Sequence, residues 1–283
     1  MSYDLFLGSP DRPLTSEQFM SFFEGRPHYD VSEQQAVYEN ETTGVYFCFD
    51  FSPEDGTVAF NLNYFRPHFF GLEAAPEVAA FVEAFDLDIH DPQHEGMEDG
   101  PFSVEGFLQG WNTGNRFGYR AILTSHPPED THVYPTTDLE RIWRWNYRLD
   151  RLQEQEGEML FVPRYMFITK DGVTRSMVVW PDAIPILIPQ ADFVYILRDE
   201  LSLKPQAEDH REMTLVKWDQ VESLVSSFPF DGEAGCYRLD YASAPLAVVQ
   251  HIQSLPIHPL GSNVGLSLDR VLNAEIVRDV LRE

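Results

Sequence analysis

The chain has 283 residues, of which 43% are hydrophobic and 13% aromatic, enough for one large core or two moderate ones. This composition excludes a chain that is disordered throughout, because such chains lack the apolar area that offsets the entropy cost of ordering. Forty-six acidic against 20 basic residues give a net charge of −26. A field of this sign repels nucleic acids and anionic membranes and attracts basic partners, although an acidic surface can also serve solubility alone.

The acidic charge is concentrated in the first half of the chain. Residues 1–130 contain 23 acidic and five basic residues, whereas residues 131–283 contain 23 and 15. No lysine or arginine occurs in residues 67–115, which hold ten acidic residues. We therefore expect a basic protein partner to bind the stretch 73–105. The expected contact residues are Glu73, Glu77, Asp88, Asp91, Glu95, Glu98 and Asp99.

Nothing in the sequence indicates a membrane or a secretory route. No apolar run reaches the roughly 20 residues of a membrane-spanning helix, and the first seven residues lack the basic and long apolar regions of a secretion signal. The two cysteines, Cys48 and Cys236, lie far apart in the sequence and fit a reducing compartment. The sequence thus predicts a cytoplasmic protein. Its 17 arginines against three lysines are typical of a GC-rich bacterial genome.

In chain order, the first half is predicted to open with a strand at 3–7, followed by a helix that begins after Thr15. Thr15 and Gln18 have the spacing of a capping box, in which each side chain satisfies the backbone N–H of the other residue. Two alternating runs follow, 45–51 and 58–64, in which every second residue is aromatic or aliphatic. Such alternation predicts antiparallel strands with one buried face.

Three helices are expected next, then a second group of strands and three short helices. The helices cover 76–85, 103–112 and 137–155; the strands cover 161–169, 173–180, 184–188 and 192–198; the last helices cover 218–226, 245–254 and 268–281. The sequence therefore predicts an α+β fold with mostly antiparallel sheets and flanking helices. Its two β-containing halves, 1–130 and 131–283, form either two domains or one continuous domain.

The motifs of the common enzyme classes are missing from the sequence, among them a phosphate-binding loop, a dinucleotide-binding glycine motif and a nucleophile elbow. The tripeptide Arg-Pro-His occurs twice, each time after an aromatic stretch. If both copies end an element at the same edge of the fold, their side chains could bind an anion or perform acid–base catalysis. Chance repetition is the alternative. The catalytic candidates are Arg26, His28, Arg66 and His68.

One segment, 86–95, combines two histidines with four carboxylates, which are the ligand types of divalent metals. Its metal candidates are His90 and His94. Pro92 lies between them and disfavours a helix that would place both on one face. A solvated acidic loop is the favoured interpretation, and we expect no metal and no cofactor.

Four glycines recur at every fourth residue, from Gly106 to Gly118. In one continuous helix each would cost roughly 1 kcal/mol relative to alanine, so a close backbone contact or a ligand would have to compensate. The alternative is that the helix ends near Asn112 and that 113–117 form a loop, with Gly114 in a turn. The sequence favours a turn or packing role over a ligand groove.

Arginines recur through the predicted helix 137–155 at the spacing of one helix face. In so acidic a chain they are interpreted first as partners of acidic residues, and an anion-binding site is the alternative. These residues are Arg141, Arg144, Arg148 and Arg151.

Three functional hypotheses follow. A non-enzymatic acidic protein that binds a basic partner is favoured, because the charge is strong and no catalytic motif is present. In this character the chain is similar to the immunity proteins that neutralise toxic effectors, a likeness of class that rests on no motif. The alternatives are a hydrolase-like or other small-molecule enzyme that uses the Arg-Pro-His residues, and a ligand-binding module around the glycine-spaced segment.

Overall fold

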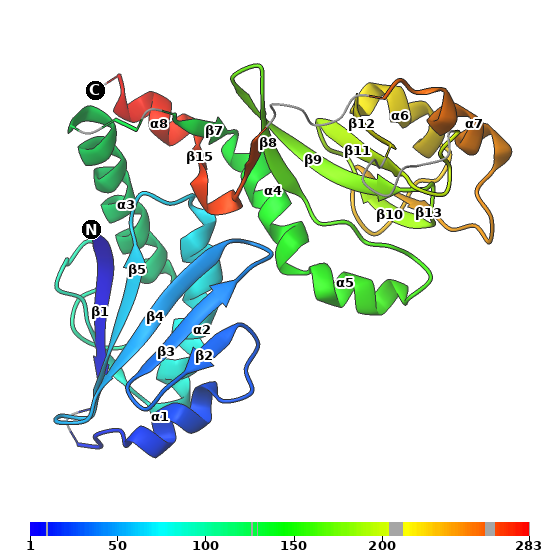
Figure 1. Cartoon of the computed structure of the whole chain (residues 1–283). Coiled ribbons are helices and arrows are strands. Elements are labelled where there is room, and N and C mark those ends of the chain that lie inside the picture. The colour runs from blue at the N-terminus through cyan, green and yellow to red at the C-terminus, as the bar shows by residue number, and fades with distance from the viewer. Residues whose placement is uncertain (10, 126, 129, 204–211, 258–263, 283) are drawn as a thin grey trace. The chain divides into compact units, whose positions relative to one another are not determined.

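The structure is a computed structural model of the chain, and it describes residues 1–283 except 10, 126, 129, 204–211, 258–263 and 283. The described residues form eight α-helices and fifteen strands in mostly antiparallel sheets (Figure 1), so the predicted α+β fold is confirmed. Among the named strands of the described residues, two pairs are parallel. These are β9 (Val173–Pro181) with β11 (Phe193–Arg198), and β7 (His132–Tyr134) with β15 (Val271–Asn273).

The chain divides into two compact units. The first unit comprises Met1–Glu140 together with Asp269–Glu283, and the second comprises Arg141–Leu268. The end of the chain therefore belongs to the first unit, and the boundary falls within helix α4 (Thr136–Tyr147). The division into the halves 1–130 and 131–283, as two domains or one continuous domain, stays a prediction.

The first unit is built on a six-stranded sheet whose order is β2-β3-β4-β5-β1-β6. Its strands are β1 (Ser2–Gly8), β2 (Tyr29–Val31), β3 (Gln35–Asn40), β4 (Val45–Ser52), β5 (Thr57–Asn63) and β6 (Asp88–His90). The main helices of this unit are α1 (Ser16–Phe23), α2 (Phe69–Phe85) and α3 (Val104–Ser125). Helix α2 passes behind the sheet in Figure 1, and α1 begins at the predicted Thr15–Gln18 capping box, which is confirmed.

One face of this sheet is buried, because alternate side chains along its strands are apolar. The alternation predicted for β4 and β5 is confirmed: every second residue from Val45 and from Val58 is buried. Rings from all three helices pack on this face. The ring-centroid distances are 5.3 Å for Phe19–Phe51, 5.4 Å for Phe81–Phe49 and 5.8 Å for Phe107–Phe60.

Helix α3 continues through the glycine-spaced segment, so the predicted loop at 113–117 and the turn at Gly114 are wrong. The reason is the close approach of Tyr3, in β1, and of Tyr64, the residue that follows β5. A Cβ atom added to Gly114 would lie 2.1 Å from Tyr64 Oη, and one added to Gly110 would lie 2.5 Å from Tyr3 Oη. These contacts offset the cost of glycine in a helix. They agree with the predicted packing role, and they fill the space that the alternative of a ligand groove requires.

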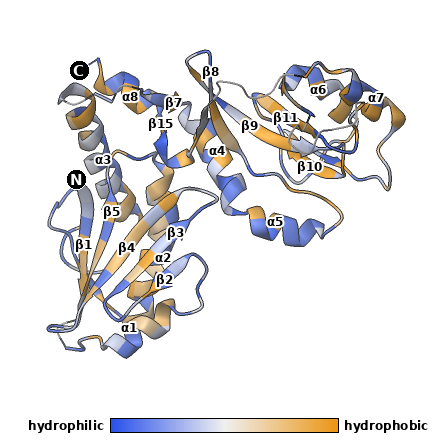
Figure 2. Cartoon of the chain, viewed as in Figure 1, coloured by the Kyte–Doolittle hydropathy of each residue, from blue (hydrophilic) through white to orange (hydrophobic). Residues whose placement is uncertain are grey.

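The second unit contains a five-stranded sheet of order β12-β11-β9-β8-β14 and a two-stranded pair, β10 with β13. Its further strands are β8 (Met166–Lys170), β10 (Ile186–Pro189), β12 (Glu212–Lys217), β13 (Cys236–Leu239) and β14 (Val264–Leu266). Its helices, besides part of α4, are α5 (Leu149–Glu156), α6 (Trp218–Val225) and α7 (Leu246–Ser254). In Figure 2 its strands carry many hydrophobic residues, whereas α5 is mostly hydrophilic.

Besides α3, three predicted helices differ from the observed ones. Helix α2 begins seven residues before the predicted start and contains Pro76. The predicted helix 137–155 is interrupted at Arg148, whose N–H donates to the Trp145 carbonyl three residues back rather than four. The predicted helix 268–281 is divided into a 3₁₀ turn (Leu268–Arg270), β15 and α8 (Ala274–Val280), because β15 pairs with β7.

We expect Gly114→Ala to lower the free energy of unfolding by about 1–3 kcal/mol, because the new Cβ displaces Tyr64 from its place against α3. Gly96→Ala should lower the free energy of unfolding further, since its Cβ would collide with the Gly106 backbone oxygen of α3, which cannot move aside as a side chain can. Urea denaturation measures both effects. Gly265→Ala is the control, because a Cβ there has no neighbour within 4 Å. Stabilisation by Gly114→Ala, as in an exposed helix, would contradict this packing.

Candidate functional site

The face of the six-stranded sheet opposite the buried one carries acidic residues. Alternation places one on each of five strands: Asp4, Asp30, Glu39, Asp50 and Asp88. None of the six strands, each described over its whole length, contains lysine or arginine. We call this surface, with its five carboxylates, the acidic face.

Strand register aligns the side chains of the acidic face in rows across the sheet. One row consists of successive Cα partners on β3, β4, β5, β1 and β6, namely Gln35, Asp50, Ala59, Phe6 and His90. Directly opposed residues point to the same side of a sheet, so these five side chains share one surface. Phe6, next to the end of this row, is an exposed aromatic residue: 45% of its surface is accessible to solvent.

The carboxylates of the acidic face that lie within the sheet are held by neutral groups. Asp4 accepts hydrogen bonds from Ser2 Oγ at 3.0 Å and from Asn61 Nδ2. Asp50 accepts from Gln35 Nε2 at 2.7 Å and from the Cys48 thiol at 3.5 Å. Burial, reinforced by the Asp50 carboxylate, raises the pKa of that thiol to about 12. These partners orient the carboxylates without neutralising their charge.

The segment after β6 extends the acidic face. It returns to the sheet at Gly100, which pairs with Ile89 of β6. His90 Nδ1 lies 2.5 Å from Asp99 Oδ1, and the His90 ring is 6.0 Å from Phe6. Among the predicted contact residues, the exposed ones are Asp88, Glu95, Glu98 and Asp99.

Two predicted contact residues are buried completely and cannot touch a partner in this structure. Glu73 lies on the inner side of α2 and accepts hydrogen bonds from Tyr38 Oη at 2.8 Å, Asn40 Nδ2 at 2.9 Å and Thr43 Oγ1 at 3.0 Å. The prediction for Glu73 is wrong because the helix begins earlier than expected and turns this residue towards the core.

Asp91 is the second buried acid, and it has a structural role. Its carboxylate accepts from Tyr3 Oη at 3.1 Å and from the backbone N–H of Gln93 at 2.9 Å.

Glu77 is half-buried and binds Arg26 Nη2 at 2.8 Å and Tyr29 Oη at 2.9 Å. The negative charge of Glu77 is therefore neutralised by Arg26 within the protein.

The two Arg-Pro-His copies do not meet, so the condition for a shared site is not fulfilled. Arg26 binds Glu77, whereas His68 precedes the first residue of α2. Nine residues of helix separate these points, about 13 Å at 1.5 Å per residue. Arg66 instead donates to Tyr46 Oη at one end of the acidic face, and His28 is exposed.

His68 belongs to a buried polar network that contains the end of the chain. Its backbone N–H donates to Asn273 Oδ1 at 2.8 Å, and its Nδ1 lies 2.7 Å from Asn273 Nδ2. An amide nitrogen only donates, so Nδ1 accepts and Nε2 carries the proton. Nε2 faces Glu140 at 3.5 Å. Burial lowers the pKa of His68, and the carboxylates of Glu140 and Glu275 oppose that shift in part.

The metal candidates are not assembled into a site. His90 is paired with Asp99, and His94 is exposed with a positive φ of 53°, so no helix begins at Pro92. Over the described ranges, no group of three or more histidine, cysteine, aspartate or glutamate residues has a metal-binding arrangement.

The four arginines do not share one helix face, because the helix is interrupted at Arg148. Arg141 Nη1 donates to Tyr165 Oη at 2.5 Å and to the Gln190 carbonyl at 3.3 Å. Arg148 pairs with Glu233 at 2.8 Å, in line with a role as a partner of acidic residues. Arg144 and Arg151 are exposed.

Comparison with known proteins identifies no relative: no protein-family model, curated protein or solved structure matches the chain. Of the helices in the described part of the chain, none is long and apolar enough to cross a membrane.

Sequence reasoning missed four residues of the acidic face: Asp4, Asp30, Glu39 and Asp50. These residues occupy the polar positions of the same alternating pattern that predicted the buried strands. Counting the charged residues at those positions would have found them, because a strand places every second residue on one face.

We expect the protein to lose stability as the pH falls below about 6.5, the ordinary histidine value, with His68 contributing to the loss. Because burial lowers the pKa of His68, the unfolded chain takes up this proton more readily than the folded protein. His68→Gln should therefore reduce the slope of the unfolding free energy between pH 7 and 5, measured by urea denaturation. His28→Gln, at the exposed copy, should retain the wild-type slope. An unchanged slope in His68→Gln would refute the assignment.

Proposed function

We propose that this protein is a non-enzymatic partner-binding protein of the immunity type, and that its acidic face binds a basic protein. The observation that carries the proposal is the distribution of charge over the six-stranded sheet. Five strands each supply one carboxylate to this surface, and no strand supplies a base.

The charge of the whole first unit supports the proposal. This unit contains 29 acidic and eight basic residues, a net charge of −21, whereas the second unit contains 17 and 12, a net charge of −5. The long-range field that accelerates the approach of a basic protein therefore originates mainly in the unit that carries the acidic face.

The acidic face combines charge with an apolar contact. Exposed Phe6 lies in the row that contains Asp50 and His90. Interfaces usually depend on a few aromatic anchors surrounded by polar residues. Neighbouring strands are about 4.8 Å apart, so the sheet holds its carboxylates at defined spacings that a cationic cleft can match. A toxin that acts on an anionic substrate has such a cleft.

The two alternative functions lose the geometry on which they rested. Arg26 binds Glu77 in the middle of α2, whereas His68 precedes the first residue of that helix, so the two Arg-Pro-His copies do not converge on one site. The glycine-spaced side of α3 is covered by Tyr3 and Tyr64. Neither arrangement offers the groups that those functions require.

The proposal is tested by removing charge from the acidic face. A protein captured from the native host by the immobilised chain is identified and purified, and its binding is followed by surface plasmon resonance. We expect the triple variant Asp4→Asn, Asp50→Asn and Asp88→Asn to slow association by about tenfold at low salt, with a smaller effect on dissociation.

The matched control removes the same charge from exposed positions of the second unit. It combines Glu154→Gln, Glu158→Gln and Glu222→Gln, and it should retain wild-type association. Equal effects of the two triple variants, an association rate that does not change with salt, or a captured protein that is not basic would each contradict the proposal.

A further inference from the structure

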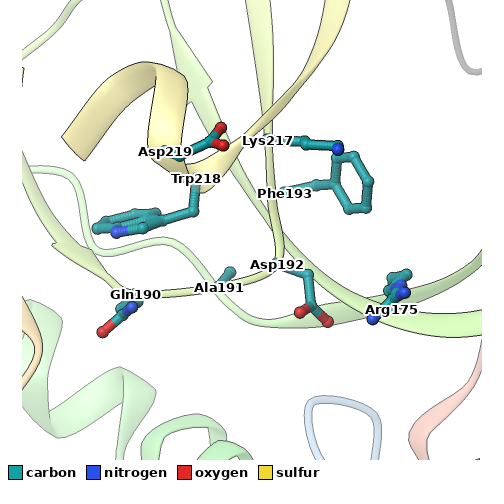
Figure 3. Close-up of a pocket in the computed structure, with 8 residues that line it drawn as sticks. All are labelled: Arg175, Gln190, Ala191, Asp192, Phe193, Lys217, Trp218 and Asp219. Atoms are coloured by element: carbon teal, nitrogen blue, oxygen red, sulfur yellow. The ribbon is translucent and has the colours of Figure 1, made fainter.

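A cavity of about 430 Å³ opens in the second unit, where β12 ends and α6 begins (Figure 3). This volume is within the range of small-molecule sites in proteins. Its lining combines two basic residues, two acidic residues, an amide, a methyl group and two aromatic rings. The lining residues are Arg175, Gln190, Ala191, Asp192, Phe193, Lys217, Trp218 and Asp219.

Strand pairing places the charged groups around an aromatic residue. Phe193 of β11 and Lys217 of β12 are Cα partners in the antiparallel pair. Helix α6 follows directly, with Trp218 and Asp219 in its first turn. Figure 3 shows Arg175 and Lys217 on the Phe193 side of the cavity, and Trp218 and Asp219 on the side of α6.

The two cations of the cavity differ from other cations of this acidic chain. Arg26, Arg148 and Arg238 each form an ion pair with a carboxylate. In the described parts of the chain, neither Arg175 nor Lys217 has an ion pair or a side-chain hydrogen bond. Their charges are therefore available to a ligand.

The remaining groups of the cavity also match a ligand with two opposite charges. Asp192 is already engaged, since its Oδ2 accepts from the N–H of Ser176 at 2.9 Å and from its hydroxyl at 3.2 Å. Asp219 is exposed and remains available for a cation. Trp218 is buried and lines the cavity beside Ala191, so the two form an apolar part of its wall.

We propose that this cavity binds a small zwitterion with an apolar side group, such as a free hydrophobic amino acid. Arg175 and Lys217 hold the carboxylate. Asp219 holds the ammonium group, and the side group packs on Trp218 and Ala191. The site lies in the second unit and uses none of the acidic face, so it is independent of the proposed partner binding.

Calorimetric titration of the full chain with three related compounds tests the zwitterion requirement. L-Phenylalanine carries both charges, 3-phenylpropionate lacks the ammonium group and 2-phenylethylamine lacks the carboxylate. We expect L-phenylalanine to bind, and each singly charged analogue to bind at least about tenfold more weakly, because one charged group of the site is then left without a partner.

Two variants assign the charges. Arg175→Gln should lower the affinity for L-phenylalanine by about tenfold and leave the affinity for 2-phenylethylamine unchanged, because only the carboxylate contact is lost. Asp219→Asn should lower the affinity for L-phenylalanine and leave the affinity for 3-phenylpropionate unchanged. Arg151→Gln removes an exposed positive charge of the same unit, on α5 and outside the cavity lining, and should bind like the wild type.

Three results would each overturn the inference. The first is an absence of binding by L-phenylalanine, L-tyrosine and L-leucine to the folded wild type. The second is a singly charged analogue that binds as tightly as L-phenylalanine. The third is an equal loss of affinity in Arg151→Gln and Arg175→Gln. The analogue comparison uses the wild type, so it remains decisive if a variant is destabilised.

Discussion

Burial of one face of the six-stranded sheet beneath α1, α2 and α3 is the constraint on which the first unit depends. Phe49 and Phe60 are fully buried in this core, with rings from α1, α2 and α3 packed among its aromatic residues. Because successive side chains of a strand point to opposite faces, burial of Phe49 directs Asp50 outward. A slip of one residue in register would exchange the two faces and bury the acids. The packing of the core and the arrangement of the acidic face therefore have one cause.

Two acids inside the first unit show how a chain of this charge folds. A carboxylate removed from water is costly unless hydrogen bonds replace its hydration. Glu73 receives three such bonds, two of them from residues of β3, and Asp91 receives one from Tyr3 of β1. Each buried acid thereby ties the helix or loop that carries it to the sheet. The acids left in water generate the negative electrostatic field of the first unit.

The end of the chain completes the first unit. Strand β15 pairs with β7, and buried Asn273 bonds to His68 in front of α2 and to Thr136 at the start of α4. Tyr119 of α3 also contacts Asn273, so one amide side chain links four segments that are distant in sequence. These long-range contacts join residues 269–283 to the first unit. The sequence could not predict this, because no local pattern encodes a partner 205 residues away.

The sequence by itself determined the α+β class, the alternating strands β4 and β5, the cap of α1 and the concentration of acid in the first half. These follow from neighbouring residues, because strand periodicity, capping and charge are local properties. Tertiary structure alone decided that Gly114 is helical, since the compensating contact comes from Tyr64, 50 positions earlier. It also decided that Asp88 is exposed while Glu73 and Asp91 are buried, and that Arg175, Lys217 and Asp219 line one cavity. Burial and convergence depend on which distant segments pack together, and that information is not contained in any short stretch of the chain.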